Sequence, residues 1–303
     1  RDRYGYTHKK DIPLDKMKEI IDSLALRGTR MITLTGGEPL FRKDLGPIID
    51  HIKSHGMTCS MVSNGAFIPK RINDIKNIDK VTLSFDGQEE GHNKNRGERS
   101  YKQVMDAVDA LNKAGIYYNF KMVVANDNVN DIEYVLDIAK KNNTGAAVTL
   151  IFTPKTMDPA DKVSQYRLTP EKSEEVLDKL VELKKKGEPL LFGVKVHEYL
   201  RDWYKRHDKE MLTESEMLED FQYLKCYAGT FYGFIHYDGE LLPCNQLIGK
   251  FKGKNVLEVG FDEAWDHLKT NECRACNIDY LTDKHVVHSF KPTYLLNQMV
   301  HRL

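Results

Sequence analysis

The stretch that decides the fold is MITLTGGEPL, residues 31–40, where an apolar and β-branched run stops at two glycines, a glutamate and a proline. The run predicts a buried strand that ends in a turn. Gly36 and Gly37 leave the backbone uncovered, so that a ligand can approach it closely, and Pro39 fixes the exit of the chain. Glu38 offers an anionic acceptor that suits an ammonium group. Because the glycines lack the spacing of a phosphate loop or a dinucleotide fingerprint, an amine-bearing ligand suits this turn better than a phosphate.

Helices and strands alternate on both sides of this stretch. Apolar residues at helical spacing predict helices over residues 11–28, 44–56, 71–78, 100–115, 129–143 and 169–187. Apolar, β-branched runs predict further strands over residues 57–65, 80–87, 117–124 and 145–154. Strands separated by helices of this length pair in parallel through right-handed crossovers, and their apolar faces are those of a sheet covered by helices. The pattern predicts an α/β fold, either a full or partial barrel or an open doubly wound sheet.

The composition excludes several classes of protein. Lys and Arg together number 45, as do Asp and Glu, so the net charge is zero; since no polybasic run occurs either, we expect no nucleic acid as partner. The longest apolar runs have the length of strands, so we expect no integral membrane segment. The charged start, RDRYGYTHKK, does not resemble a secretory signal, and we expect a cytoplasmic protein. Because the first residue is not Met, we also expect the chain to begin inside a longer protein.

The carboxyl ends of the predicted strands carry the clearest functional signal, because parallel α/β sheets bind ligands at that edge. Three of these ends read TGGEP, VSNG and LSFDG, and HNKNRG follows the third. In this order they resemble the GGE, T-N-G and S-x-D-G…H-x-x-x-R-G motifs of radical S-adenosylmethionine (SAM) enzymes, with Ser63 in place of Thr. The resemblance implies that SAM contacts Gly36, Gly37, Glu38, Pro39, Ser63, Asn64, Ser84 and Arg96. It places the amino group of SAM at the GGE motif, and the ribose and carboxylate near Ser84 and Arg96, whose guanidinium offers a fork of donors.

Four of the five cysteines lie in the last quarter of the chain: Cys226, Cys244, Cys273 and Cys276. Their spacing is C-x12-G-x4-C followed by C-x2-C, and a hairpin with a later loop can bring four such thiolates around one metal ion or cluster. The spacing alone fits zinc and an iron–sulfur cluster equally well. Cys59 lies in a predicted strand, where we expect a small buried apolar residue.

The same cysteine spacing resembles the auxiliary-cluster extension of radical SAM enzymes called SPASM, or its shorter twitch form. A full SPASM domain needs further cysteines after C-x2-C, whereas this chain offers only His285 and His288 there, which we interpret as ordinary loop residues. The resemblance therefore implies one auxiliary [4Fe–4S] cluster on the four late cysteines. It also implies a catalytic [4Fe–4S] cluster on a C-x3-C-x2-C motif, which residues 1–303 lack, so that we expect its ligands before Arg1.

Together with the strand count, the resemblance implies a partial (β/α)6 TIM-like barrel, without its first strand, in residues 1–200. Residues 201–285 are then a small twitch-type, cysteine-rich domain, and residues 286–303 a tail helix. Within this part, the polar residues 198–221 are predicted to be helical, and residues 229–244 predict a β-hairpin around an Asp-Gly turn.

For function, the resemblance implies reductive cleavage of SAM and abstraction of hydrogen from an unactivated carbon of a peptide or small molecule. The result would be an oxidation or a bond-forming modification, with electrons from a donor such as flavodoxin or ferredoxin. The auxiliary cluster would accept electrons from the substrate, relay them, or hold the C-terminal unit. The competing interpretation is a non-catalytic α/β binding protein, stapled by zinc, that has lost the catalytic cluster. The sequence does not name the substrate.

Overall fold

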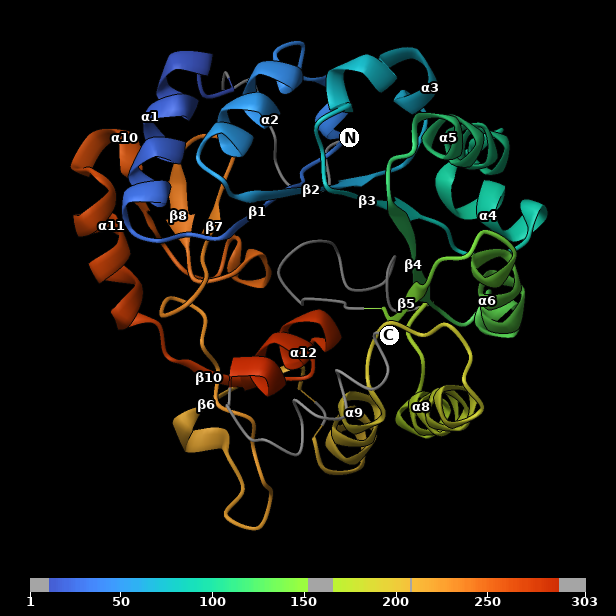
Figure 1. Ribbon diagram of the computed structural model, residues 1–303. Coiled ribbons are helices and arrows are strands. Elements are labelled where there is room, and N and C mark those ends of the chain that lie inside the picture. Colours follow the sequence, from blue (N-terminus) through green and yellow to red (C-terminus); the bar gives the residue numbers. More distant parts are fainter. Residues whose placement is uncertain (1–10, 152–165, 208, 289–303) are drawn as a thin grey trace.

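A curved sheet of five parallel strands forms the centre of the molecule (Figure 1). The computed structural model describes residues 11–151, 166–207 and 209–288. The strands are β1 (Met31–Leu34), β2 (Thr58–Ser63), β3 (Lys80–Ser84), β4 (Tyr118–Val124) and β5 (Ala146–Leu150). They lie side by side in chain order, with Met31 opposite Thr58 and Val81 opposite Tyr118. The prediction of an α/β fold built on a partial barrel is confirmed, since the described strands form an open arc.

Helices surround the outer side of this arc (Figure 1). They are α1 (Leu14–Leu26), α2 (Leu45–Ser54), α3 (Ile68–Arg71), α4 (Glu89–Arg96), α5 (Ser100–Ala114), α6 (Ile132–Lys141), α8 (Pro170–Lys185) and α9 (Val194–Arg206). Helix α8 begins where the Thr169 hydroxyl accepts the N–H of Lys172, as its Thr-Pro start indicates. The core between helices and sheet includes Phe120 and Cys59, both fully buried, which confirms the apolar role predicted for the cysteine.

The first strand differs from its prediction. Among the described residues, β1 is an edge strand, and exposure alternates along it, with Met31 50% exposed. The prediction of a buried strand is therefore wrong for β1, because no described strand covers its outer edge. At the opposite edge, Leu190 forms a parallel bridge with Ala146 and extends the sheet beyond β5.

The last third of the chain adds two small antiparallel sheets. One consists of β7 (Phe234–Ile235), β8 (Glu240–Leu242) and β9 (Lys254–Asn255), and the other pairs β6 (Met211–Thr213) with β10 (Cys273–Cys276). The pairing of β7 with β8 confirms the predicted hairpin. The helices of this part are α10 (Val256–Val259), α11 (Phe261–His267) and α12 (Asp279–His288). Helix α1 docks against it, because Ile20 shares an apolar cluster with Val256 and Ala264.

Two predictions in this part are wrong. The helix predicted over residues 198–221 ends at Arg206, because residues 211–213 pair with β10 instead and a capping box starts a 3-10 turn directly after them. His285 and His288 lie on α12 and not in a loop, and His285 is buried, with Nε2 2.8 Å from the Tyr232 hydroxyl. The predicted tail helix lies outside the described residues beyond His288. No helix in the described part of the chain is both long enough and apolar enough to cross a membrane.

Candidate cofactor and substrate site

The carboxyl ends of β1 and β2 meet at Glu38. Its Oε1 accepts hydrogen bonds from the Ser63 hydroxyl at 2.9 Å and from the N–H of Leu40 at 3.2 Å, and its Oε2 accepts one from the N–H of Asn64 at 2.8 Å. Burial raises the pKa of this carboxyl, while the three hydrogen bonds act in the opposite direction. A carboxylate has about four acceptor positions, so one remains for a further donor. The structure thus brings three of the predicted residues together around one partly satisfied anion.

The two glycines before Glu38 present bare backbone. Gly36 has a φ of +149°, and a Cβ added to it or to Gly37 would meet no atom within 4 Å. A side chain at Gly36 would therefore find space but would strain the backbone. Pro39 begins a short 3-10 turn, Pro39–Phe41, which leads the chain away from the strand end.

Arg96, the last residue of α4, is held in place by Asp86. Its Nε lies 2.5 Å from Oδ2 of Asp86, whose Oδ1 accepts the N–H of Val123 at 3.0 Å. The Asp86 side chain is 8% exposed and that of Arg96 28%. No described residue bonds the two Nη atoms of Arg96, so this pair of donors is available to an anion. Ser84 ends β3 beside this pair, and its hydroxyl also has no described partner.

Three residues of this corner were not predicted: Asp86, His92 and Asn128. The Nδ2 of Asn128 donates to the carbonyl groups of Asp86 at 3.0 Å and Val123 at 2.9 Å. The Nδ1 of His92 accepts the N–H of Asp86 at 3.1 Å, and burial lowers the pKa of His92 to about 4, which keeps the ring neutral near pH 7. A signal for two of them was present, since Asp86 and His92 are the D and H of the S-x-D-G…H-x-x-x-R-G pattern.

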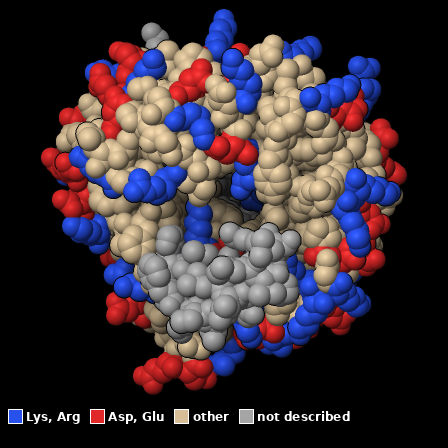
Figure 2. Space-filling model, in the orientation of Figure 1, with Lys and Arg blue, Asp and Glu red and all other residues tan. Residues whose placement is uncertain are grey.

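A cavity of about 310 Å³ lies between the carboxyl ends of the strands and the cysteine-rich part of the chain. Figure 2 shows this face hollowed at its centre, inside the arc of strands drawn in Figure 1. The lining includes Gly36, Lys121 and Thr149 from the barrel, and Asn277 and Asp279 from the C-terminal part. The volume is at the lower end of the range for small-molecule sites.

Two charged residues of this cavity were also missed, although Lys121 is the only charge in its strand sequence, YYNFKMVV. The Nζ of Lys121 lies 4.9 Å from the centroid of the Tyr280 ring, and no described carboxylate pairs with it. Burial raises the pKa of the Asp279 carboxyl to about 7, although the charge of Lys121 acts to lower it. The cavity therefore contains an unpaired cation, among the described residues, and a carboxyl that can take up a proton near neutral pH.

The four late cysteines adjoin the same cavity. Cys244 follows β8, Cys273 and Cys276 begin and end β10, and Asn245 and Asn277, next to two of them, line the cavity. Cys244 and Cys276 are buried in one apolar cluster, against which Cys273 packs. Burial raises the pKa of all four thiols, to about 11 for Cys244 and about 12 for Cys273, and charge on one thiol raises the pKa of the others.

The placement of the four thiols bears on whether they can surround one zinc ion. Within the described residues, the groups of three ligand atoms that all lie within 4.8 Å of one another include no cysteine. A zinc ion with thiolates at about 2.3 Å would hold its sulfur atoms about 3.8 Å apart. As placed, no three of the thiols are therefore close enough to surround one zinc ion.

Comparison with known proteins shows which family the barrel resembles. Residues 2–139 match the model of the radical SAM superfamily. This part of the chain, just under half of its length, is similar to radical SAM domains. The match includes β1 to β4, and with them the turn at Glu38, the corner at Ser63 and Asn64, and the pair of Asp86 and Arg96.

Similarity to whole proteins extends further along the chain. The AdoMet-dependent heme synthase of Oleidesulfovibrio alaskensis is 28% identical over 84% of this chain and 66% of its own length. The structure of Streptococcus suis SuiB bound to the precursor peptide SuiA has a TM-score of 0.65 at 16% identity, over 86% of this chain and 60% of SuiB. The structure of anSMEcpe with bound AdoMet and the Kp18Cys peptide has a TM-score of 0.60 at 14% identity, over 97% of this chain and 81% of anSMEcpe. This chain thus spans just under two thirds of the heme synthase and of SuiB, and it shares with SuiB and anSMEcpe a partial barrel followed by small sheets.

Proposed function

We propose that this protein is a radical SAM enzyme that abstracts hydrogen from an unactivated carbon of a substrate bound in the cavity. One observation carries the proposal: the Glu38 turn, the Ser63–Asn64 corner and Arg96 stand beside the ends of three adjacent strands, and Gly36 of that turn lines the cavity. When bound and reductively cleaved at a [4Fe–4S] cluster, SAM supplies the radical. The ligands of that cluster are assigned to no residue of this chain, and its electron is expected from a flavodoxin or ferredoxin.

The side chains at this mouth suit the polar groups of SAM. The free acceptor position of Glu38 fits the ammonium group, which the bare backbone at Gly36 and Gly37 allows to come close. The two Nη groups of Arg96 fit the carboxylate, since Asp86 already holds the guanidinium by Nε. The hydroxyl of Ser84 is left for the ribose. In this scheme Ser63 and Asn64 act through Glu38, because they orient its carboxylate.

We further propose one auxiliary [4Fe–4S] cluster, held by Cys226, Cys244, Cys273 and Cys276, in a twitch-type unit of residues 201–285. The spacing of the four cysteines, which resembles that of twitch-type extensions, supports this proposal. Burial raises the pKa of these thiols, so a bound metal centre, either zinc or a cluster, is needed to hold them as thiolates at neutral pH. Since the residues that follow two of the cysteines line the cavity, the position favours an auxiliary cluster that accepts an electron from the substrate.

The charges in the cavity favour a substrate that carries a carboxylate. Lys121 has no described anionic partner and can supply one ionic contact, while Asp279 can accept the proton that a two-electron oxidation releases. The comparisons do not choose between a small molecule, as in the name of the heme synthase, and a peptide, as in the SuiB complex. We expect compounds that carry a carboxylate to stimulate the cleavage of SAM. The amides of the same compounds should not stimulate it, and the Lys121→Met variant should respond to the carboxylates less than the Lys121→Arg variant.

The test uses the full-length protein, reconstituted without oxygen. We expect about eight irons per chain, in two [4Fe–4S] clusters, and formation of 5′-deoxyadenosine from SAM after reduction. Glu38→Gln should keep the iron and lower the affinity for SAM. A colourless protein that holds one zinc and forms no 5′-deoxyadenosine would refute the proposal and would favour the alternative, a non-catalytic zinc-stapled binding protein.

A further inference from the structure

We propose that Asp22, His51 and His55 form a binding site for a divalent transition-metal ion on the outer side of the barrel. The three residues line no part of the cavity and include none of the cysteines, so the site is separate from the proposed chemistry. Asp22 belongs to α1, whereas His51 lies in the last turn of α2 and His55 directly follows that helix. An ion bound there would join the two helices.

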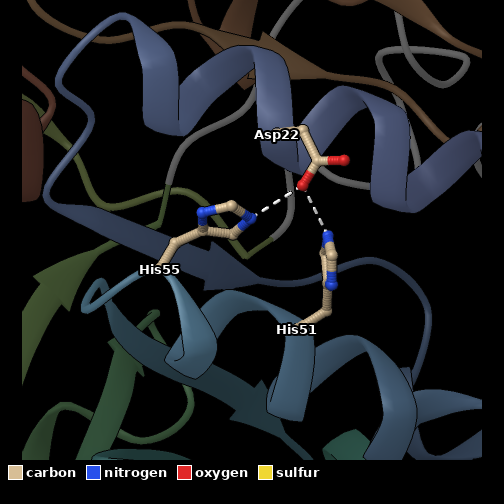
Figure 3. Close-up of side chains that lie close together, drawn as sticks. All are labelled: Asp22, His51 and His55. Atoms are coloured by element: carbon tan, nitrogen blue, oxygen red, sulfur yellow. Dashed lines mark hydrogen bonds and ion pairs between the residues drawn. The ribbon is translucent and has the colours of Figure 1, made fainter.

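The ligand atoms converge on one point. The Nε2 atoms of His51 and His55 each lie 2.7 Å from Oδ1 of Asp22 (Figure 3). The two rings stand nearly perpendicular, at 86°, with their centroids 5.1 Å apart. His51 and His55 point to the same side of α2 because residues four apart in a helix are neighbours. Figure 3 shows both rings directed across the gap between the helices to the same carboxylate.

A metal ion fits this arrangement with a small adjustment. In a tetrahedral zinc site with ligands at about 2.05 Å, neighbouring ligand atoms lie about 3.3 Å apart. The nitrogen–oxygen distances of 2.7 Å would have to open by about 0.6 Å, which side chains exposed by 23%, 33% and 47% can do by small rotations. Water would complete the coordination.

The protonation of the cluster is compatible with a metal. Oδ1 of Asp22 faces both Nε2 atoms, so its carboxylate is placed to serve as an anionic ligand. Without metal, each Nε2 carries the proton that it donates to Asp22. No described residue bonds the Nδ1 of either ring, so the proton can move to Nδ1 when a metal ion takes its place. With the proton on Nδ1, both Nε2 lone pairs face the metal position. Because no described carbonyl or carboxylate supports Nδ1, we expect moderate affinity.

The donor set selects the class of metal. Two imidazoles and one carboxylate suit Zn²⁺, Co²⁺, Ni²⁺ or Cu²⁺, whereas Mg²⁺ and Ca²⁺ prefer oxygen ligands. The other such group of described residues, His236, Asp238 and Glu240, is less suited. There the carboxylate of Asp238 already accepts the N–H of Glu240, and the carboxylate of Glu240 accepts the N–H of Gly253, just before β9.

The test is a titration of Zn²⁺ into the tag-free, cluster-loaded protein, followed by calorimetry. We expect one zinc site in the wild-type protein and no binding of Mg²⁺ to it. Asp22→Asn and His51→Gln should each weaken the zinc site at least about tenfold, since even residues that only orient metal ligands contribute about 10–100-fold. Asp15→Asn removes the same charge from the same helix, away from the histidines, and should leave binding unchanged.

Zinc absorption spectroscopy separates this site from the cysteines. Nitrogen and oxygen neighbours at about 2.0–2.1 Å support the proposal, whereas sulfur neighbours at about 2.3 Å place the zinc on the thiols and overturn it. A His51→Gln/His55→Gln variant that melts like the wild-type protein without added metal, yet binds zinc equally well, also overturns it. Neither measurement uses SAM, so a failure here and a failure of the proposed enzyme activity can be told apart.

Discussion

Replacement of Asp86 by Asn should destabilise the protein more than the small change in side-chain size suggests. The carboxylate accepts from Arg96 and from the N–H of Val123 at once. The amide of Asn keeps one acceptor, so its NH₂ group must face one of these two donors. A hydrogen bond to a charged group contributes about 1.5–3 kcal/mol, and the loss of one partner from a fully buried ion pair costs about 3–5 kcal/mol. Because Arg96 is 28% exposed, water offsets part of the loss, and we expect unfolding free energy to fall by about 2 kcal/mol.

The assay is a double-mutant cycle followed by circular dichroism during anaerobic unfolding in urea. The cycle compares Asp86→Asn, Arg96→Gln and the double variant with the wild-type protein. If the ion pair carries the effect, the double variant loses less stability than the sum of the single variants, by at least about 1 kcal/mol. Asp131→Asn is the matched control, because Asp131 also accepts a backbone N–H, from Gln88, but contacts no arginine.

Single losses that add to within about 0.5 kcal/mol, the range found for independent sites, would refute the coupling of Asp86 with Arg96. An Asp86→Asn variant that loses no more stability than Asp131→Asn would refute it as well. If coupling is found, both variants at the ion pair should also bind SAM more weakly, because the Nη groups of Arg96 lose their fixed direction.

Three further changes test other parts of the structure. Gly87→Ala should lower the unfolding free energy by about 2 kcal/mol or more, measured in urea, because its Cβ would lie 2.1 Å from Oδ2 of Asp131 at a φ of +141°. Since burial raises the pKa of Glu38 above its ordinary 4.5, the folded chain binds that proton more tightly than the unfolded chain, and stability falls as pH rises from 4.5 through the folded pKa. Glu38→Gln should flatten that fall in melting temperature; an unchanged pH profile would contradict the assigned burial effect. Cys276→Ser should remove about four irons per chain from the reconstituted protein, whereas Cys59→Ser should remove none.

The sequence predicts the barrel well because its signals are local. Each strand of the main sheet falls within a predicted range, and each is bounded by helices whose apolar spacing is visible over one or two turns. The predictions that failed concern segments whose structure depends on residues far away in the sequence. Residues 211–213 form a strand only because β10 lies beside them, and the exposure of β1 depends on what borders its edge. Local composition contains neither fact.

The residues of the candidate site also fall into those that local sequence predicts and those that it does not. Glu38, Ser63 and Arg96 stand in short motifs at strand ends, so their positions follow from the sheet. Lys121 and Asp279 lie far apart in the sequence and share a cavity only after the C-terminal part folds over the barrel. A single charge in an apolar strand was the one available signal for Lys121, and nothing near Asp279 in the sequence distinguishes it from a surface residue.

Glu38 and Asp86 occupy equivalent positions in the sheet, and both connect the proposed ligand site to neighbouring strands. Each carboxylate follows one strand and accepts a backbone N–H from the next element of the sheet: Asn64 just after β2, and Val123 within β4. A ligand held by Glu38 and Arg96 would therefore be fixed relative to two strand pairs at once. Because binding to the folded state alone adds stability, SAM should raise the melting temperature of the wild-type protein, and this rise should shrink when either carboxylate is replaced by its amide.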